Sequence, residues 1–181
     1  MKIRLAADLQ TDSIVDGIGI RTVVWTQGCS HNCPDCHNPQ THDFKGGDLV
    51  ELEDVIEKIE NLSGQDGVTF SGGDPMFQPR ECSILAKKVH ELGMNVWAYT
   101  GFTYEELINK GSKDILEFLK NIDVLIDGKF DPNLKSLDCS FRGSTNQRLI
   151  DVSKSLENHG VVLYNLNKNK INSKKKEAIY I

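Results

Sequence analysis

Strand-like and helix-like segments alternate along most of this 181-residue chain. Residues 22–27 are mainly β-branched and aromatic and are apolar on both faces, which is typical of a buried parallel strand. Residues 52–62 instead place apolar side chains three and four positions apart, as on one face of a helix. Repeated alternation of this kind predicts βαβ units and a parallel sheet. The expected strands are residues 22–27, 68–70, 95–100, 122–126, 149–152 and 161–164, and the expected helices are residues 52–62, 82–92, 103–110, 112–120 and 153–158.

The length of the chain limits how such a sheet can close. A closed barrel of eight βα units needs roughly 250 residues, so we expect an open, partial βα barrel of about five to six units. Reactive groups in parallel α/β folds lie at the carboxyl ends of the strands. Three loops of unusual composition, residues 28–38, 71–75 and 127–130, each follow an expected strand. We therefore expect them to meet at one edge of the sheet.

Charge divides the chain into two parts. The formal net charge is −5, but residues 165–181 contain five lysines and one glutamate, a net charge of +4. We predict one domain over residues 1–164 and a flexible basic tail over 165–181. The acidic domain argues against nucleic-acid binding. No segment approaches the ~18 apolar residues of a membrane span, and the first residues lack a signal peptide.

Five cysteines are present, and an odd number favours reduced thiols in the cytoplasm over a secreted disulfide scaffold. Three of them, Cys29, Cys33 and Cys36, lie within eight residues in a C-x3-C-x2-C pattern. Thiolates so close together repel one another unless a cation shares their charge. A zinc ion with His31 or His37 as fourth ligand, an iron–sulfur cluster, or plain buried thiols would each account for the pattern. The spacing favours the iron–sulfur cluster.

The cysteine pattern, on a loop after the first expected strand, resembles that of the radical S-adenosylmethionine (SAM) superfamily. The resemblance implies a [4Fe–4S] cluster bound by Cys29, Cys33 and Cys36, with one iron open to SAM. It also implies reductive cleavage of SAM to methionine and a 5′-deoxyadenosyl radical. The superfamily commonly has an aromatic residue before the third cysteine, near the adenine of SAM. Asp35 stands there instead, so the resemblance assigns adenine contact to the backbone from Asp35 through Cys36 to His37.

The two other loops fit the same resemblance. Gly72 and Gly73 permit close approach of a ligand to the backbone, although a plain tight turn would also explain them. The resemblance assigns Asp74 to the amino group of SAM. It assigns Asp127 and Lys129 to the carboxylate, for which a lysine is a suitable point charge; the alternative is a solvated turn. No catalytic residue is expected beyond the cluster ligands.

A narrower resemblance comes from six stretches taken together. They resemble the activating proteins of anaerobic ribonucleoside-triphosphate reductase, which install a glycyl radical on the large reductase subunit. The resemblance implies that subunit as partner and flavodoxin or ferredoxin as electron donor. The alternatives are an activase of another glycyl-radical enzyme such as pyruvate formate-lyase, a small radical SAM enzyme of deazaguanine synthesis, and a non-enzymatic zinc-binding or electron-transfer module. The stretches are residues 16–21, 28–38, 71–75, 97–101, 124–130 and 142–148.

Overall fold

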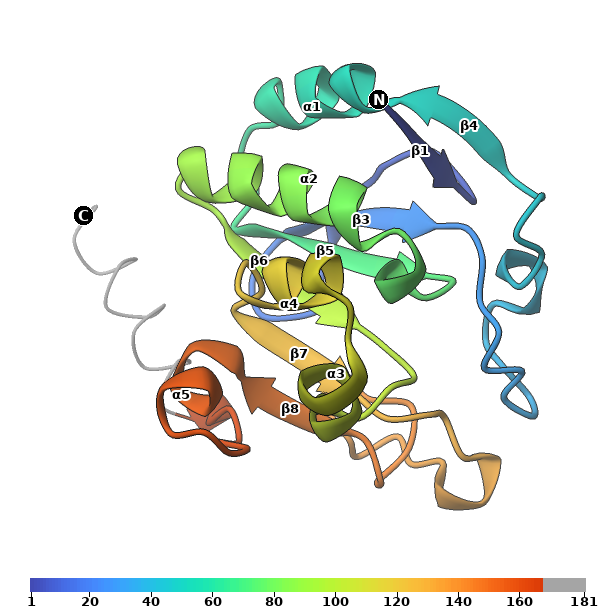
Figure 1. Cartoon of the computed structure of the whole chain (residues 1–181), viewed down its shortest axis with the longest axis vertical. Helices are drawn as coiled ribbons and strands as arrows, with labels where there is room; N and C mark the ends of the chain where they lie inside the picture. Colours follow the sequence, from blue (N-terminus) through green and yellow to red (C-terminus); the bar gives the residue numbers. More distant parts are fainter. Residues whose placement is uncertain (168–181) are drawn as a thin grey trace.

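The computed structural model of the chain describes residues 1–167 and contains one mixed sheet of eight strands (Figure 1). The strand order is β4-β1-β3-β5-β6-β7-β8, and β2 pairs with β3 outside this path. The ends of the path, β4 and β8, are not joined to each other in the described part of the chain. The strands are β1 (Lys2–Leu5), β2 (Gln10–Ser13), β3 (Arg21–Thr26), β4 (Asp48–Glu51), β5 (Gly67–Gly72), β6 (Asn95–Tyr99), β7 (Val124–Asp127) and β8 (Arg148–Asp151).

The centre of the sheet is parallel, as the sequence predicted. Strands β3, β5, β6 and β7 pair in parallel, with Val24 opposite Phe70 and Ala98 opposite Leu125. The strands on either side run antiparallel: β1 and β2 against β3, β4 against β1, and β8 against β7. The open α/β sheet is therefore confirmed, while the parallel part is limited to four strands.

Helices cover one face of this sheet and form the larger core with it (Figure 1). Phe70 on β5 meets Phe118 on α4 edge to face, with ring centroids 5.4 Å apart. Local sequence fixes where α3 begins, because Thr103 and Glu106 form a reciprocal capping box. The helices are α1 (Leu52–Glu60), α2 (Pro79–Glu91), α3 (Tyr104–Lys110), α4 (Lys113–Leu119) and α5 (Val152–Glu157), with short 3₁₀ turns η1 (Pro39–Thr41), η2 (Pro75–Phe77) and η3 (Pro132–Leu134).

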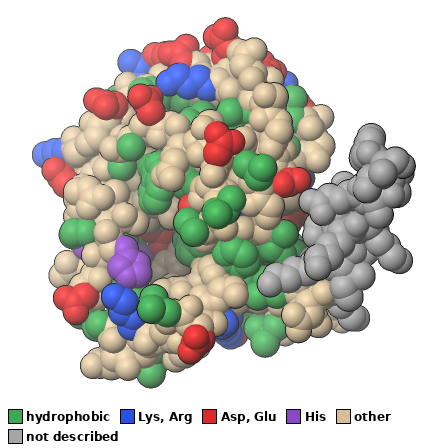
Figure 2. Space-filling model, turned by 180° about the vertical axis from the view of Figure 1, so that it is seen from behind, with side chains coloured by type: hydrophobic (Ala, Val, Ile, Leu, Met, Phe, Trp, Pro, Cys, Tyr) green, Lys and Arg blue, Asp and Glu red, His purple; other side chains and the backbone are tan. Residues whose placement is uncertain are grey.

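Within residues 1–167, loop residues such as Ile18, Phe141 and Tyr164 pack on the opposite face. Its small core is built from Trp97, Val124, Ile126 and Leu149, and Phe141 packs on the Trp97 ring at 5.4 Å between centroids. Figure 2, which views the molecule from behind, shows hydrophobic side chains gathered around a hollow on this side. In the described part of the chain, this loop-covered face leaves room for a site at the strand ends.

Several expectations need correction or lie outside the described residues. Residues 161–164 do not form a strand; an isolated bridge joins Leu163 to Ile150. Strands β1, β2 and β4 were not predicted. Of the predicted tail, residues 168–181 lie outside the described residues. None of the described helices has the length and apolar character needed to cross a membrane.

Candidate functional site

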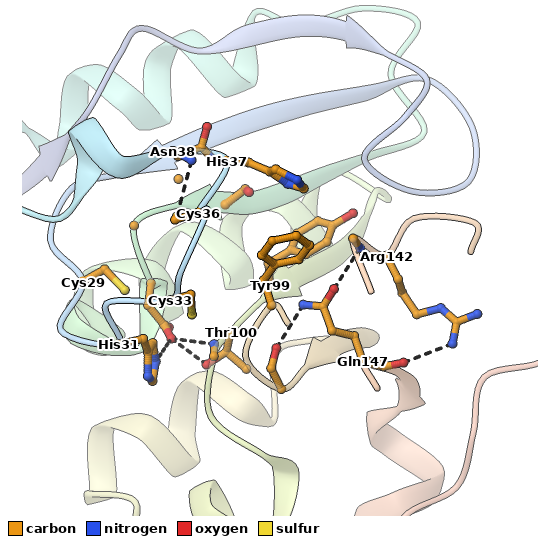
Figure 3. A pocket seen from close by; sticks show the side chains of 18 of the residues that line it. Cys29, His31, Cys33, Cys36, His37, Asn38, Tyr99, Thr100, Arg142 and Gln147 are labelled. Atoms are coloured by element: carbon orange, nitrogen blue, oxygen red, sulfur yellow. Dashed lines mark hydrogen bonds and ion pairs between the residues drawn. The ribbon is translucent and has the colours of Figure 1, made fainter. Parts of the chain in front are cut away.

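The three predicted loops meet at the carboxyl ends of the parallel strands, as expected. They line one cavity of about 530 Å³. The loop after β6 joins them and contributes Thr100 and Gly101. The segment 136–143 lines another part of the cavity. Figure 3 shows these side chains arranged around the open space. One pocket therefore collects residues that lie more than 100 positions apart in the chain.

All three motif cysteines line this pocket, and none is in a disulfide (Figure 3). Asn32 and Asp35 both adopt left-handed backbone conformations with φ of 51°, which these residue types tolerate. The loop is thereby wound tightly, and the Cys36 amide donates to the carbonyl of Cys33 at 3.3 Å. The loop geometry brings each half-buried sulfur to the pocket wall.

The electrostatics of these thiols suit a cationic cofactor. Burial raises the pKa of Cys29 to about 11. Burial also raises the pKa of Cys33, an effect that the Phe130 backbone amide and the Lys129 charge partly offset. Burial thus disfavours the free thiolates, and a bound metal centre would supply the positive charge that stabilises them as ligands. Three soft sulfur donors on one loop fit an iron–sulfur cluster.

A single zinc ion fits the geometry less well. Within residues 1–167, no three histidine, cysteine, aspartate or glutamate side chains are placed to hold one metal ion. His31, one of the proposed fourth ligands, directs Nε2 to Asp74 at 2.7 Å. The ligands of a four-iron cluster bind different iron atoms, so their sulfurs need not converge on one point.

The glycine loop packs against the start of the cysteine loop. Gly72 has φ of +99°, and a Cβ atom there would lie 2.6 Å from the Thr26 carbonyl oxygen. A Cβ atom on Gly73 would lie 2.5 Å from the carbonyl oxygen of Gly28. The Gly73 and Asp74 amides donate to those same two carbonyls at 2.7 and 3.0 Å. Both glycines line the pocket, but the close approach they permit in this structure is that of the protein backbone itself.

The acid of this loop, Asp74, is only 1% exposed. Its Oδ1 accepts from the Met76 amide at 2.9 Å and thereby caps η2. Its Oδ2 accepts from the Thr100 hydroxyl at 2.8 Å and from the Gly101 amide at 2.9 Å. Together with the His31 contact, these bonds give Oδ2 three partners and Oδ1 one, and Asp74 also lines the pocket.

The acid–lysine loop, residues 127–130, has its aspartate in the interior and its lysine at the surface. Asp127 is 1% exposed and is not among the residues that line the pocket. Its carboxylate accepts from the Tyr104 amide at 2.8 Å and from Nε of Arg148 at 3.0 Å. Lys129 is exposed, whereas its neighbours Gly128 and Phe130 line the pocket.

The three residues expected near the adenine do not all line the pocket. Cys36 and His37 line the pocket, but Asp35 is exposed and does not. The His37 ring lies on Phe130, with centroids 4.6 Å apart and an interplanar angle of 45°. An aromatic pair from two loops thus stands beside the third cysteine.

Sequence reasoning missed how the loop around Gln147 is held. Its Oε1 accepts from the Gly143 amide at 2.8 Å, and its Nε2 donates to the carbonyl of Gly128 at 3.0 Å. Asn146 donates to the carbonyl of Lys129 at 2.8 Å. These bonds fasten residues 142–148 to the acid–lysine loop (Figure 3). The sequence offered one clue to the pocket residues Thr100 and Gly101, because they lie at the end of the expected strand 95–100.

Comparisons with known proteins agree with this site. The chain matches the family of 4Fe-4S single cluster domains over residues 15–150. The anaerobic ribonucleoside-triphosphate reductase-activating protein of Enterobacteria phage T4 is 36% identical over 141 residues, which cover 75% of this chain and 86% of the phage protein. The protein of the same name from Escherichia coli K12 is 34% identical over 145 residues, covering 74% and 90%.

Two further similarities extend outside that group. The pyruvate formate-lyase-activating enzyme of Clostridium pasteurianum is 32% identical over 164 residues, covering 86% of this chain and 64% of that enzyme. The crystal structure of QueE from Escherichia coli has a TM-score of 0.48 at 14% identity and covers 70% of each chain. The family match and the long alignments to the reductase activators show that this chain belongs to the family of anaerobic ribonucleoside-triphosphate reductase-activating proteins.

Proposed function

We propose that this chain is a radical SAM activating enzyme that generates the glycyl radical of an anaerobic ribonucleoside-triphosphate reductase. One observation carries the proposal: the three cysteines of the motif line a single open pocket where the parallel strands end. Members of its family carry a 4Fe-4S cluster, and its relatives are named for activating the reductase. The large reductase subunit is accordingly the partner.

In this proposal the chain's own residues hold and orient the reactants. Cys29, Cys33 and Cys36 would hold three irons of a [4Fe–4S] cluster and leave the fourth for SAM. A reduced cluster would supply the electron that cleaves SAM to methionine and a 5′-deoxyadenosyl radical, which would take a hydrogen atom from a glycine Cα of the partner and leave as 5′-deoxyadenosine. The remaining pocket residues bind parts of SAM and limit access of water to it.

The positions of the pocket residues support individual contacts to SAM. Gly72 and Gly73 offer backbone carbonyls to the amino group. Backbone at Cys36 and His37, with Phe130 behind the His37 ring, faces the adenine, and Asp35 contributes through its turn. Lys129 provides positive charge for the carboxylate. Asp127 supports that loop from the interior, because its carboxylate is already bound to Arg148 and Tyr104.

The setting of the reaction belongs to the same proposal. An outside donor, flavodoxin or ferredoxin, reduces the cluster. Free cysteines that line an open pocket suit an anaerobic cytoplasm. The net charge of −5 gives no reason to expect nucleic acid as a partner.

Anaerobic reconstitution tests the proposal in two steps. The purified chain is loaded with iron and sulfide, and metal content and reductive cleavage of SAM are measured. The large reductase subunit is then added, and a glycyl-radical EPR signal is sought. We expect about four irons per chain, methionine release and the radical signal. Zinc without iron, or a cluster that never cleaves SAM, would refute the enzyme assignment.

A second candidate is activation of pyruvate formate-lyase, because an activase of that enzyme aligns with 86% of this chain. The chain covers only 64% of that relative but 86% of the phage reductase activator. The reductase is therefore the favoured partner. Offering both partners in parallel separates the candidates, since only the true substrate acquires the glycyl radical.

The exposed cation beside the pocket gives a first mutational prediction. Changing Lys129 to Ala is expected to weaken SAM binding about tenfold, because one charge-assisted contact to a carboxylate is lost. Changing Lys135 to Ala, an exposed lysine of the same segment that does not line the pocket, serves as control. Calorimetry on the reconstituted protein measures both. Equal affinity in the Lys129 variant and the wild type would reject the contact.

A further inference from the structure

The Asp74 carboxylate links three separate segments of the pocket. Through Oδ1 it caps η2 at the Met76 amide. Through Oδ2 it receives the Thr100 hydroxyl and the Gly101 amide, both at the end of β6. The same oxygen contacts His31 Nε2 at 2.7 Å, and His31 belongs to the cysteine loop. A single buried oxygen therefore connects the cluster loop with the ends of two sheet strands.

The histidine is enclosed on its other sides as well. Its side chain is 7% exposed, and its ring meets Phe102 edge-on with centroids 4.4 Å apart. A Cβ atom on Gly101 would lie 2.7 Å from Nε2 of His31, so the ring packs where only glycine leaves room. In the sequence His31 stands between Cys29 and Cys33. Fixing this ring consequently fixes the backbone that carries both sulfurs.

We propose that His31 and Asp74 form a positioning pair that holds the Cys29–Cys33 part of the cluster loop against the sheet. This inference rests on the proposed function, because it takes those cysteines as cluster ligands. It changes the expected role of Asp74. Its carboxylate makes four contacts to the protein itself, and although Asp74 also lines the pocket, we expect it to act on SAM through the loop that it holds.

Asparagine at position 74 is the informative substitution. If its amide nitrogen replaces Oδ2, it opposes the Gly101 amide, and a donor faces a donor. If the group is flipped, the nitrogen opposes the Met76 amide instead. Either orientation leaves one buried N–H group without an acceptor. The contact to His31 loses its charge as well, so the histidine should no longer be held.

The experiment compares clusters before SAM or partner is added. The variants are Asp74→Asn and His31→Leu in the full chain, each reconstituted beside the wild type. Asp131→Asn is the matched control, because Asp131 caps η3 through the Asn133 amide as Asp74 caps η2. Iron retention against a chelator and the EPR spectrum of the reduced cluster are recorded. We expect both pocket variants to lose iron about tenfold more readily, as for other outer-shell partners, and to share an altered spectrum, while the control matches the wild type.

A rescue variant and a double variant separate positioning from general damage. His31→Gln retains an N–H donor for Asp74 and should recover most of the iron retention that His31→Leu loses. The double variant of His31→Leu and Asp74→Asn should lose no more iron than Asp74→Asn alone, since Asp74→Asn already breaks the contact that His31→Leu removes. Circular dichroism verifies that each variant is folded. If Asp74→Asn does not fold, the comparison of iron retention between His31→Leu and His31→Gln still tests the pair.

Other outcomes would contradict the proposal. An Asp74→Asn protein with wild-type iron retention and spectrum, but weaker SAM binding, would overturn the pair and support direct contact. Additive losses in the double variant, or no difference between His31→Leu and His31→Gln, would overturn it too. A wild-type chain that takes up no iron would refute the proposed function and, with it, the role of the pair. Failure of the pair alone would leave iron uptake by the wild type intact, so the two failures can be told apart.

Discussion

Changing Cys33 to Ala is expected to remove the iron–sulfur cluster and, with it, all activation of the reductase. Two remaining thiols on a surface loop hold a four-iron cluster poorly, because a cluster normally takes cysteine at each protein-bound iron. The chemistry belongs to the cofactor, so the loss is complete and not graded. Iron content and the absorbance of the reconstituted protein measure the effect directly, and the glycyl-radical signal measures its consequence.

The chain supplies two matched controls. Cys82 is fully buried in the core on α2 and lies outside the pocket. Its change to Ala should preserve the cluster and lower the free energy of unfolding by about 1 kcal/mol. Cys139 lines the same pocket but stands outside the motif, and its change to Ala should leave the iron content at the wild-type level. An equal loss of iron in the Cys139 and Cys33 variants would contradict the predicted ligand set.

The parallel centre of the fold was predictable because each strand there is a short apolar run followed by a helical stripe. The outer strands were not. Strand β4 is largely exposed and holds one apolar pair in four residues, and it pairs with β1 so that Glu51 lies opposite Lys2, 49 positions earlier. Residues 161–164 show the reverse error. They are apolar, but Leu163 is 63% exposed and Tyr164 packs on Trp97 at 5.6 Å, so the run meets β8 in one isolated bridge, Leu163 to Ile150, and does not form a strand.

The site was predictable to the same extent. Cysteine spacing and the rule that loops meet where parallel strands end were sufficient to bring Cys29, Cys33, Cys36 and the glycine loop together. The contacts of Asp74 and Asp127 were not predictable, because they depend on partners far away in the sequence. Asp74 meets Thr100 and Gly101 across two strands, and Asp127 meets Arg148 from the neighbouring strand. The motifs predict that acids stand at positions 74 and 127, but the packing of the fold determines which groups each carboxylate contacts.

Arg148 is the most consequential of these distant partners. It stands at the start of β8 and contacts the buried Asp127 carboxylate on β7. It also binds Glu105 on α3 with two hydrogen bonds of 3.0 and 2.7 Å. The two carboxylates raise the pKa of Arg148, and Arg148 lowers the pKa of Glu105. One cation thus joins β7, β8 and α3 directly beneath the loop that carries Lys129.

Changing Arg148 to Met is expected to lower the free energy of unfolding by about 2 kcal/mol at pH 7. Removing one partner of a buried ion pair costs roughly 3–5 kcal/mol, and Arg148 is 33% exposed, so water reduces that cost. Without Arg148, the Asp127 carboxylate is left with the Tyr104 amide as its hydrogen-bond partner within residues 1–167. Urea unfolding of the reconstituted chain measures the difference. Changing Lys154 to Met, which breaks an exposed ion pair with Asp151, is the control and should cost less than about 0.5 kcal/mol.

The pH dependence of that difference gives a second, independent check on Arg148. The pKa of Glu105 is lowered below 4.5 in the folded protein, so its pair with Arg148 adds stability above the unfolded pKa and loses it as the pH falls through the folded pKa. Wild type and the Arg148 variant should therefore differ most near neutral pH and converge as the pH drops below about 4.5. A difference that stays constant down to acidic pH would show that Arg148 stabilises the fold by packing its side chain and not by its charge.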